Sequence, residues 1–465
     1  MLDIATFRKQ LPRDYFDPAQ PIILTRAPGR LDVMGGVASY SGGLCLSWPL
    51  ECTTFCALQR RDNRMIEVQS ANAGEQGWAE RVVASRAELT PPDYQTARAG
   101  LAAAPHQAWA KHVLGALVVL HLVGGAQFPR SFGARIFVAS DVPPGAGVAA
   151  SAALQVAAAN ALCALFEVRL DGHALARLCQ KVETEVIGVP WGHADHLAVA
   201  LGRKNHLTRI LCQPDKLQGH AALPDGAMLF GIDSGVRPVD NTAYLRSRCA
   251  AFMGRRMLHD LLPGVLRGAD GAEYLGNVPP DVWRAVRDAL PAHITGTEFM
   301  QRFYRGHRDE ATTVEPDITY AVRMATEHPV YESDRARRFV TLLRLAGENE
   351  KARQRLLAAA GDLMIQSHFS YEHRCGLGTP ETDAIVRLAR EQGPQAGILG
   401  ARLTGRGAGG TVAILADRRA NPDVRGTVHA IAAAYEKSSG HKPRVLAGSS
   451  DGARAFGAEE EIMHL

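Results

Sequence analysis

The chain has 465 residues, a net charge of only +4 and a balanced composition, with 46% hydrophobic and 22% charged residues. This length suggests roughly two to four domains, and so small a charge excess favours neither a nucleic acid nor a membrane surface as a partner. The longest apolar stretches, 113–126 and 152–166, are shorter than the roughly 20 residues that a membrane-spanning helix needs.

The N-terminal sequence has no apolar run bounded by a cleavage site, so we expect no signal peptide. Eight cysteines are spread along the chain, and Cys52 and Cys56 are the only close pair in its sequence. Because no second pair completes a zinc site, we expect reduced, mostly buried thiols and a cytoplasmic location.

The first part of the chain predicts strands separated by glycine-rich turns. Apolar or β-branched runs predict buried strands at 22–27, 44–49 and 53–59, and a weaker strand at 65–69. The polar residues 70–105 predict loops and short connections. Apolar residues at helical spacing then predict a core helix over 109–122.

A glycine-rich loop lies between a predicted strand and a predicted helix. The strand is 134–139, the loop is Pro143–Gly147, and the alanine-rich helix continues to Leu165. A loop of this kind presents backbone N–H groups and the positive end of the helix dipole, which suits a phosphate group. A tight strand-to-helix turn without a ligand is the alternative interpretation.

The rest of the chain alternates helices with shorter strands. A helix over 172–187 carries Glu183 and ends at the break Gly188–Pro190, and an apolar run follows at 197–201. A polar stretch at 216–223 indicates a domain boundary. Beyond it the patterns predict strands at 227–232, 397–403 and 411–416, helices at 244–262, 332–359, 363–370 and 381–391, and an irregular insertion at 263–330.

Three glycine-rich clusters, 28–43, 143–147 and 405–410, stand at strand edges, where backbone can approach a ligand. The sequence lacks a P-loop motif. The third cluster lies between two strands, so the context of a dinucleotide-binding fingerprint is missing as well.

Several side chains are candidates for chemistry. Asp195, just beyond a Pro/Gly break, is an acid–base candidate, and Arg30 could direct its guanidinium at phosphate oxygens unless it is a surface arginine. Glu183 and Ser151 are candidate ligands of Mg²⁺, although most helical glutamates are simply solvated. His193 and His196 flank Asp195, but without a fourth ligand they are better interpreted as loop or core histidines.

These motifs together resemble those of the GHMP small-molecule kinases, and within that family the galactokinase and L-arabinokinase branch. The similarity rests on Ala27–Gly36 with Tyr40, on Pro143–Ala153, on Leu403–Gly410, and on the segment Glu183–Asp195. The resemblance implies an α+β fold with two domains, 1–215 and 216–465, and an active site between them. The first domain is expected to contain a left-handed β-α-β crossover, and the second to be ferredoxin-like.

The resemblance also implies a role for each matching residue. Asp195 and Arg30 would be catalytic, Ser151 and Glu183 would bind Mg²⁺, and Ser39, Gly192 and Tyr244 would contact a sugar. The ATP phosphates would be bound by Pro144, Gly145, Ala146, Gly147, Val148, Ala149, Ala150, Ser151, Gly407 and Gly409. The implied activity is ATP-dependent phosphorylation of the anomeric hydroxyl of L-arabinose or a galactose-like sugar.

Three positions depart from the family pattern. Ala150 replaces a serine of the phosphate loop, Ser39 replaces an aspartate that binds sugar hydroxyls, and His196 replaces a glutamine, with His193 in place of an apolar residue. Because a hydroxyl cannot replace a charged acceptor, Ser39 predicts altered sugar affinity or choice. Two alternatives stay open: a sugar and ATP sensor without catalysis, and a uronic-acid 1-kinase with a basic group near the sugar.

Overall fold

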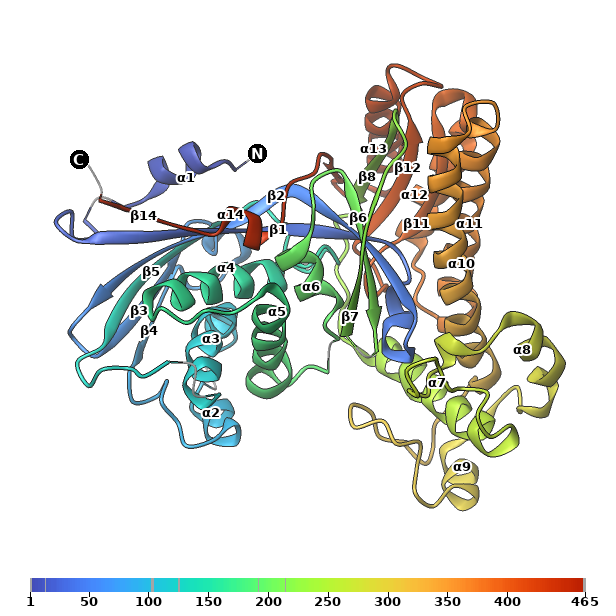
Figure 1. Ribbon diagram of the computed structural model, residues 1–465, viewed down its shortest axis with the longest axis horizontal. Coiled ribbons are helices and arrows are strands. Elements are labelled where there is room, and N and C mark those ends of the chain that lie inside the picture. The colour runs from blue at the N-terminus through green and yellow to red at the C-terminus, as the bar shows by residue number, and fades with distance from the viewer. Residues whose placement is uncertain are drawn as a thin grey trace.

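The computed structural model describes residues 2–12, 14–101, 104–123, 126–190, 192–213 and 215–462. Figure 1 shows two bodies side by side, one on a large mixed sheet and one on a smaller sheet flanked by long helices. Among the described residues, the large sheet has eight strands: β1 (Pro21–Met34), β2 (Leu44–Arg61), β3 (Met65–Ser70), β4 (Arg81–Ser85), β5 (Gly133–Ser140), β6 (His206–Cys212), β7 (Asp215–Ala222) and β14 (Ala458–Ile462).

The strands follow the order β14-β1-β2-β5-β3-β4, with β6 on β2 and β7 on β6. The pair β3–β5 is parallel and the other pairs of this sheet are antiparallel. A parallel pair needs a crossover connection, which here contains α2 (Tyr94–Gly100) and α3 (Lys111–Leu122). The left-handed crossover expected in this body stays a prediction.

The large sheet is covered on both faces, because successive side chains of a strand point to opposite sides. Phe55 of β2 stacks on Phe7 of α1 (Ile4–Gln10), with ring centroids 5.1 Å apart. The neighbouring Cys56 belongs to the core of the opposite face, together with the alanine-rich α4 (Ala150–Leu165). Small side chains on α4 allow close packing, so that the Thr25 hydroxyl donates to the Ala157 carbonyl at 2.7 Å.

Two further helices of the first body are α5 (Gly172–Lys181), which lies below α4 in Figure 1, and α6 (Ala194–Leu201). The short α14 (Ala453–Phe456) and β14 bring the end of the described chain back to this body, where β14 pairs with β1. Strand β7 also belongs to the large sheet. The division of the chain into 1–215 and 216–465 stays a prediction. The structure adds that β7 and β14, which lie at or beyond this division in the sequence, join the large sheet of the first body.

The second body has the predicted ferredoxin-like arrangement. Its sheet, in the order β11-β12-β8-β13, is antiparallel throughout and consists of β8 (Ala227–Asp233), β11 (Ile398–Leu403), β12 (Thr411–Asp417) and β13 (Arg444–Leu446). Helices connect β8 to β11, and α13 (Val424–Ser439) connects β12 to β13. This gives the β-α-β-β-α-β succession of a split βαβ fold. The other helices of this body are α7 (Thr242–Leu261), α10 (Val322–Glu348), α11 (Arg353–Cys375) and α12 (Pro380–Gln392).

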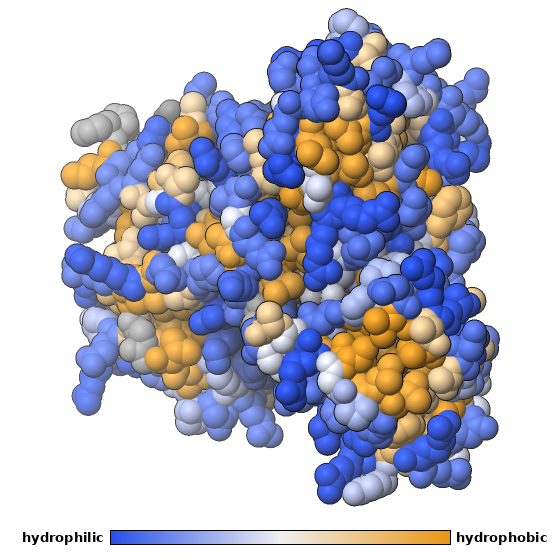
Figure 2. All heavy atoms as spheres, turned by 45° about the vertical axis from the view of Figure 1, so that its right-hand side comes forward, coloured by the Kyte–Doolittle hydropathy of each residue, from blue (hydrophilic) through white to orange (hydrophobic). Residues whose placement is uncertain are grey.

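The predicted insertion contains short elements: α8 (Pro280–Val286), α9 (Gly296–Arg302), and the pair β9 (Ile294–Thr295) and β10 (Thr319–Tyr320). Figure 1 shows α8 and α9 at the lower right of the molecule. Figure 2 shows apolar surface in that lower right-hand part. The exposed apolar side chains of this part of the sequence include Leu261, Met300, Tyr304 and Met324.

Several predicted elements differ from the observed ones. The two strands 44–49 and 53–59 are one strand, β2, and the loop region 70–105 contains β4 and α2. Helix α10 begins at Val322, within the predicted insertion, and includes Pro329, while the predicted helix 332–359 is broken between α10 and α11. Helix α5 ends at Lys181 and continues as a π-helical turn, Val182–Ile187.

The helix through Pro329 has a local physical reason. Proline weakens a helix without preventing it, because packing can offset the lost hydrogen bond, and the first turns of α10 are largely buried.

All eight cysteines are buried and form no disulfide, as predicted. None of the helices in the described ranges is both long and apolar enough to cross a membrane.

Candidate active site

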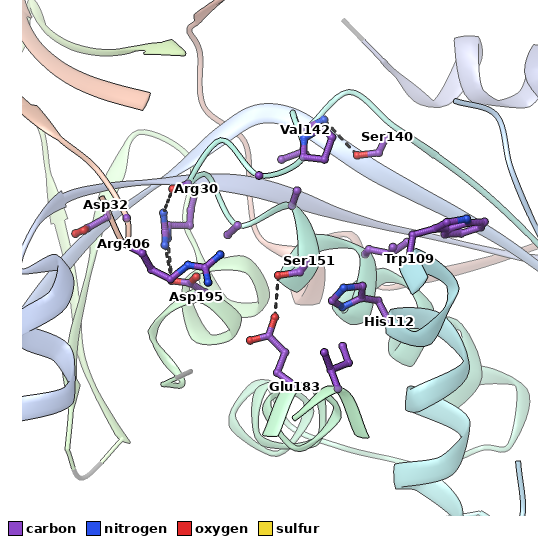
Figure 3. Close-up of a pocket in the computed structure, with 18 of the residues that line it drawn as sticks. Arg30, Asp32, Trp109, His112, Ser140, Val142, Ser151, Glu183, Asp195 and Arg406 are labelled. Carbon is purple, nitrogen blue, oxygen red and sulfur yellow. Dashed lines mark hydrogen bonds and ion pairs between the residues drawn. The ribbon is translucent and has the colours of Figure 1, made fainter. Parts of the chain in front are cut away.

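A cavity of about 540 Å³ lies between the two bodies and collects most of the predicted site residues (Figure 3). The predicted residues that line it are Arg30, Ser39, Pro144, Gly145, Gly147, Ala149, Ala150, Ser151, Glu183, Gly192, Asp195 and Tyr244. Four predicted residues do not line it: Ala146, Val148, Gly407 and Gly409. The three glycine-rich clusters therefore meet at one place, although not every member faces the cavity.

The loop between β5 and α4 turns sharply to place the helix N-terminus at the cavity. Gly145 and Gly147 have φ values of +68° and +74°, and Ala149, the residue before α4, has a φ of +64°. Such a conformation is costly for alanine and persists only where the surroundings impose it. The first N–H groups of α4 have no partner within the helix, and Ala150 and Ser151 of this first turn line the cavity.

The carbonyl groups of this loop are bound by other parts of the chain. The backbone N–H of Arg30 donates to Val148 at 3.0 Å, and its Nη1 donates to Gly147 at 2.7 Å. The Thr411 hydroxyl donates to the Ala146 carbonyl at 2.8 Å, and Arg237 Nε donates to the Pro144 carbonyl at 2.8 Å. With its carbonyls held in this way, the loop is suited to binding an anion through its N–H groups.

Glu183 and Ser151 form a buried pair at the start of α4. The Ser151 hydroxyl donates to Glu183 Oε1 at 2.8 Å, and Glu183 is only 4% exposed. Glu183 belongs to the π-helical turn after α5, a type of turn that is frequent at functional sites. Burial raises the pKa of Glu183 to about 7, against the opposing effect of the Ser151 hydrogen bond.

This pair fits a hard divalent cation. A carboxylate and a hydroxyl are oxygen donors of the kind that Mg²⁺ prefers, with phosphate oxygens and water completing its coordination. Burial makes the charge of Glu183 costly, and a cation at this position would compensate it. Glu183 and Ser151 are therefore the residues of this cavity best suited to hold Mg²⁺.

Asp195 lies in the first turn of α6 and is held by Arg30 of β1. Arg30 Nε and Nη2 both donate to Asp195 Oδ1, at 3.0 and 2.6 Å. The Arg30 side chain is 6% exposed, whereas that of Asp195 is 39% exposed. Burial raises the pKa of Asp195, but the Arg30 guanidinium outweighs this effect and holds the pKa below its ordinary value. Asp195 is therefore ionised and able to accept a proton.

The wall expected to contact a sugar is formed by Ser39, Gly192 and Tyr244, from three separate segments of the chain. Ser39, half-buried, lies in a 3-10 turn, Gly36–Ser41, and the Tyr244 side chain comes from α7. The ring of Tyr40 packs edge-on against Tyr244, with centroids 5.9 Å apart. This turn requires glycine at position 36, because a Cβ there would lie 1.4 Å from the hydroxyl of Tyr371.

The two histidines near Asp195 do not line the cavity. His196 is fully buried, and its Nε2 donates to Gln155 Oε1 at 2.6 Å, while Gln155 Nε2 donates to His112 Nδ1 at 2.8 Å. Burial lowers the pKa of His196 to about 3, so it is neutral. His193 lies 3.7 Å from Asp215. His196 is therefore a core histidine, as the sequence favoured.

The third glycine-rich loop packs against the phosphate loop. A Cβ on Gly405, whose φ is +69°, would lie 2.8 Å from the Gly147 carbonyl oxygen. Gly407 instead packs against Leu377, and Gly409 against Val236. Glycine at these last two positions therefore serves close backbone packing, and their contact with phosphate stays a prediction.

The sequence-based prediction missed several residues that line the cavity. They include Arg406 of the third loop, and Trp109, Lys111 and His112 around the start of α3. Figure 3 shows Trp109 and His112 on the opposite side of the cavity from Arg406. Arg406 could have been noticed, because it is the one charged side chain within the glycine-rich stretch 404–411. The α3 residues carried no comparable signal, since their pattern is that of any core helix.

Comparison with known proteins agrees with this geometry. The GHMP kinases N terminal domain matches residues 111–203, and the GHMP kinases C terminal domain matches residues 349–430. A galactokinase of Lactococcus lactis, whose structure was solved with galactose, has the same fold, with a TM-score of 0.75 and 19% identity. That match covers 97% of this chain and 98% of the galactokinase.

Two sequence relatives extend over nearly the whole chain. An L-arabinokinase of Arabidopsis thaliana is 32% identical, covering 95% of this chain but 47% of its own length, so the chain spans about half of that protein. A galactokinase of Roseiflexus sp. (strain RS-1) is 27% identical, with 97% of both chains covered. The chain therefore contains the N- and C-terminal domains of the GHMP kinases, and over nearly its whole length it is similar to a galactokinase and to about half of an L-arabinokinase.

Proposed function

We propose that the protein transfers the γ-phosphoryl group of ATP to the anomeric hydroxyl of a monosaccharide, L-arabinose or a galactose-like sugar. The products are the sugar 1-phosphate and ADP. The names of the relatives support this activity. The observation that carries it is the position of Asp195, an ionised carboxylate that shares Arg30 with the phosphate loop.

In this proposal the nucleotide phosphates bind the loop 144–151. The N–H groups of the loop and the N-terminus of α4 stabilise their negative charge. Mg²⁺, held by Ser151 and Glu183, would neutralise charge on the phosphates when bound. The alanines and glycines of the loop leave room for the phosphates to approach the backbone closely.

Asp195 acts as the base. The sugar's anomeric O–H gives its proton to Asp195, the oxygen forms a bond to the γ-phosphorus, and the bond from that phosphorus to the bridging oxygen of ADP breaks. Arg30 keeps Asp195 ionised and orients it by holding Oδ1 with two N–H groups. Because Arg30 also binds the Gly147 carbonyl, the base and the phosphate loop are held at a constant separation.

The sugar would lie between the Gly36–Ser41 turn and Tyr244, which line the cavity beside Asp195. Tyr244 offers a ring face and a hydroxyl. Ser39 offers a neutral hydroxyl, so this position provides no charged acceptor for the hydroxyl groups of the sugar. This predicts weaker sugar binding than a carboxylate would provide.

The test is ADP release from ATP and Mg²⁺ across a panel of pentoses, hexoses and uronic acids. We expect release that depends on L-arabinose, galactose or a close stereoisomer and saturates with the sugar. Tight binding of ATP and sugar with no turnover would favour a sensor and contradict the proposal. Turnover confined to uronic acids would replace the proposed substrate class.

A further inference from the structure

Arg406 is the charged residue of the third glycine-rich loop, and its side chain lies at the cavity. It is exposed and lines the cavity with Arg30 and Asp195. Figure 3 shows its guanidinium beside the Arg30–Asp195 pair and on the same side of the cavity. Nη1 of Arg406 donates to Asn241 Oδ1, at 3.0 Å, where α7 begins.

The backbone that carries Arg406 is firmly held. The Tyr371 hydroxyl donates to the Gly405 carbonyl at 3.1 Å, and the Ala408 N–H donates to the Leu377 carbonyl at 2.7 Å. Gly405 itself packs directly on Gly147 of the phosphate loop. A long cationic side chain on such a fixed loop can reach a reacting group with its position well defined.

The phosphate loop needs cations from elsewhere. From Gly145 to Ala150 the loop has no polar side chain, and the hydroxyl of the next residue, Ser151, donates a hydrogen bond to Glu183. ATP and the transferring phosphoryl group carry several negative charges, and stabilising them is the main task of a phosphoryl-transfer site. Within the described residues, the lysine and arginine side chains that line the cavity are Arg30, Lys111 and Arg406.

Two of these three cations are less suitable. Arg30 directs Nε and Nη2 at Asp195 and Nη1 at the Gly147 carbonyl, so its N–H groups already hold the base and the loop. Lys111 begins α3, and the next residue of this helix, His112, lies on the opposite side of the cavity from Asp195 in Figure 3. Arg406 is on the side of the base, where the sugar oxygen and the γ-phosphorus must meet.

We propose that Arg406 is a catalytic residue that binds the γ-phosphoryl group of ATP and stabilises its charge during transfer. This inference rests on the proposed function. A guanidinium offers several N–H donors in a plane that matches two phosphate oxygens. The bond from Nη1 to Asn241 links this side chain to the residue before α7.

The charge of Arg406 already acts on its neighbours. Burial and the Arg30 charge have the largest effects on the pKa of Asp195, and the Arg406 charge lowers it further. Burial raises the pKa of Tyr244, and the Arg406 charge opposes that increase. Arg406 therefore lies within electrostatic range of both the base and the sugar wall.

Two substitutions at this position, Arg406→Ala and Arg406→Lys, test the proposal against Arg305→Ala, which removes an exposed arginine that does not line the cavity. We expect Arg406→Ala to lower kcat by about 10²- to 10³-fold while the sugar KM changes less than about threefold. Arg406→Lys keeps the charge without the planar fork and should be intermediate. Arg305→Ala should match the wild type.

A binding measurement tests the role of Arg406 independently of turnover. Titration calorimetry with ATP and with ADP gives the preference for the nucleotide that has the γ-phosphate, and Arg406→Ala should lose most of that preference. An unchanged preference would overturn the proposal. So would a kcat within threefold of the wild type, or a defect confined to the KM of uronic acids, which would assign Arg406 to a sugar carboxylate.

The same design separates this inference from the proposed function. If the wild type phosphorylates no sugar of the panel, the proposed function fails. The ATP-over-ADP preference of the wild type and of Arg406→Ala then still decides whether Arg406 binds the γ-phosphate. Thermal unfolding of each variant shows that it is folded, which is expected because the Arg406 side chain is exposed.

Discussion

Arg30 donates two hydrogen bonds to a single carboxylate oxygen of Asp195, at 3.0 and 2.6 Å, and a third to the Gly147 carbonyl at 2.7 Å. One guanidinium therefore links the proposed base to the loop proposed to hold the phosphates. This link joins β1, α6 and the loop that precedes α4, which are contributed by separate parts of the sequence. It lowers the pKa of Asp195, and in the proposed mechanism it also sets the distance of Asp195 from the nucleotide.

Asp195→Asn should remove the proton acceptor while keeping the shape of the side chain. We expect kcat to fall by about 10²- to 10⁴-fold, with ATP affinity changed only a few-fold. Steady-state kinetics and nucleotide titration measure the two effects separately. Asp215→Asn, at a carboxylate paired with Arg177 outside the cavity, is the control, and near-normal kcat in Asp195→Asn would sink the assignment of the base.

Arg30→Met should shift the pH dependence of catalysis. In the wild type Arg30 outweighs burial and holds the pKa of Asp195 low, so without it burial dominates and the pKa rises. The acidic limb of kcat/KM should then move to higher pH, and activity should be lost earlier as the pH falls. Arg30→Lys keeps the charge and should shift less. An acidic limb that stays in place in Arg30→Met argues against this coupling.

Glu183 should make the stability of the metal-free protein depend on pH. Its pKa in the folded protein, about 7, lies above the ordinary value of 4.5. The folded state therefore binds the extra proton between these values, and the stability from this group is lost as the pH rises through them. The change is on the order of 3 kcal/mol.

Unfolding with a chelator present, from pH 5 to 8, measures this effect as the difference between wild type and Glu183→Gln. The variant does not titrate there, so it should lack that component of the slope. Mg²⁺ with ATP should stabilise the wild type at pH 8 and do so less below pH 7, because the cation competes with the proton. Equal slopes for the two proteins would show that Glu183 does not titrate in this range.

Gly405→Ala should disrupt the contact between the two glycine-rich loops. Its Cβ would lie 2.8 Å from the Gly147 carbonyl oxygen, at a φ of +69°. Gly440→Ala is a matched control, because its φ is +73° but nothing lies within 4 Å of the added atom. Both should lose about 1 kcal/mol from the backbone conformation, and Gly405→Ala should in addition lose ATP affinity. Similar behaviour of the two variants would mean that this contact is unimportant.

Ser39→Asp should strengthen sugar binding if this turn contacts the sugar. A carboxylate forms hydrogen bonds with hydroxyl groups that are stronger by about 1–2 kcal/mol, so the sugar KM should fall by roughly tenfold. Ser39→Ala is the companion variant and should change KM little. The KM for ATP serves as an internal reference, and a change confined to it would place Ser39 away from the sugar.

The parts of the site that were predictable from sequence are those with a strict backbone requirement. Gly145, Gly147 and Gly405 all have positive φ values, which favour glycine, and so the loops were visible as glycine clusters. Gly407 and Gly409 show the limit of this reasoning. Glycine is required equally by a bound phosphate and by a close neighbouring backbone, and here the neighbours are Leu377 and Val236.

Other features depend on contacts between distant segments. The chain of hydrogen bonds His112–Gln155–His196 joins three helices, and no local pattern indicates it. Strand β14 carries Glu459, Glu460 and Glu461 and is largely exposed, so it lacks the apolar alternation by which a strand is predicted. Its pairing with β1 creates the strand.

The most direct test of the central claim is the identity of the phosphorylated product. Wild-type protein with ATP, Mg²⁺ and L-arabinose or galactose is followed by phosphorus and proton NMR, with Asp195→Asn as the blank. We predict a phosphate on the anomeric carbon, seen as coupling of phosphorus to the anomeric proton, formed in equal amount to ADP. Phosphate at another position of the sugar, or ADP formed with no phosphorylated sugar from any member of the panel, would contradict the claim.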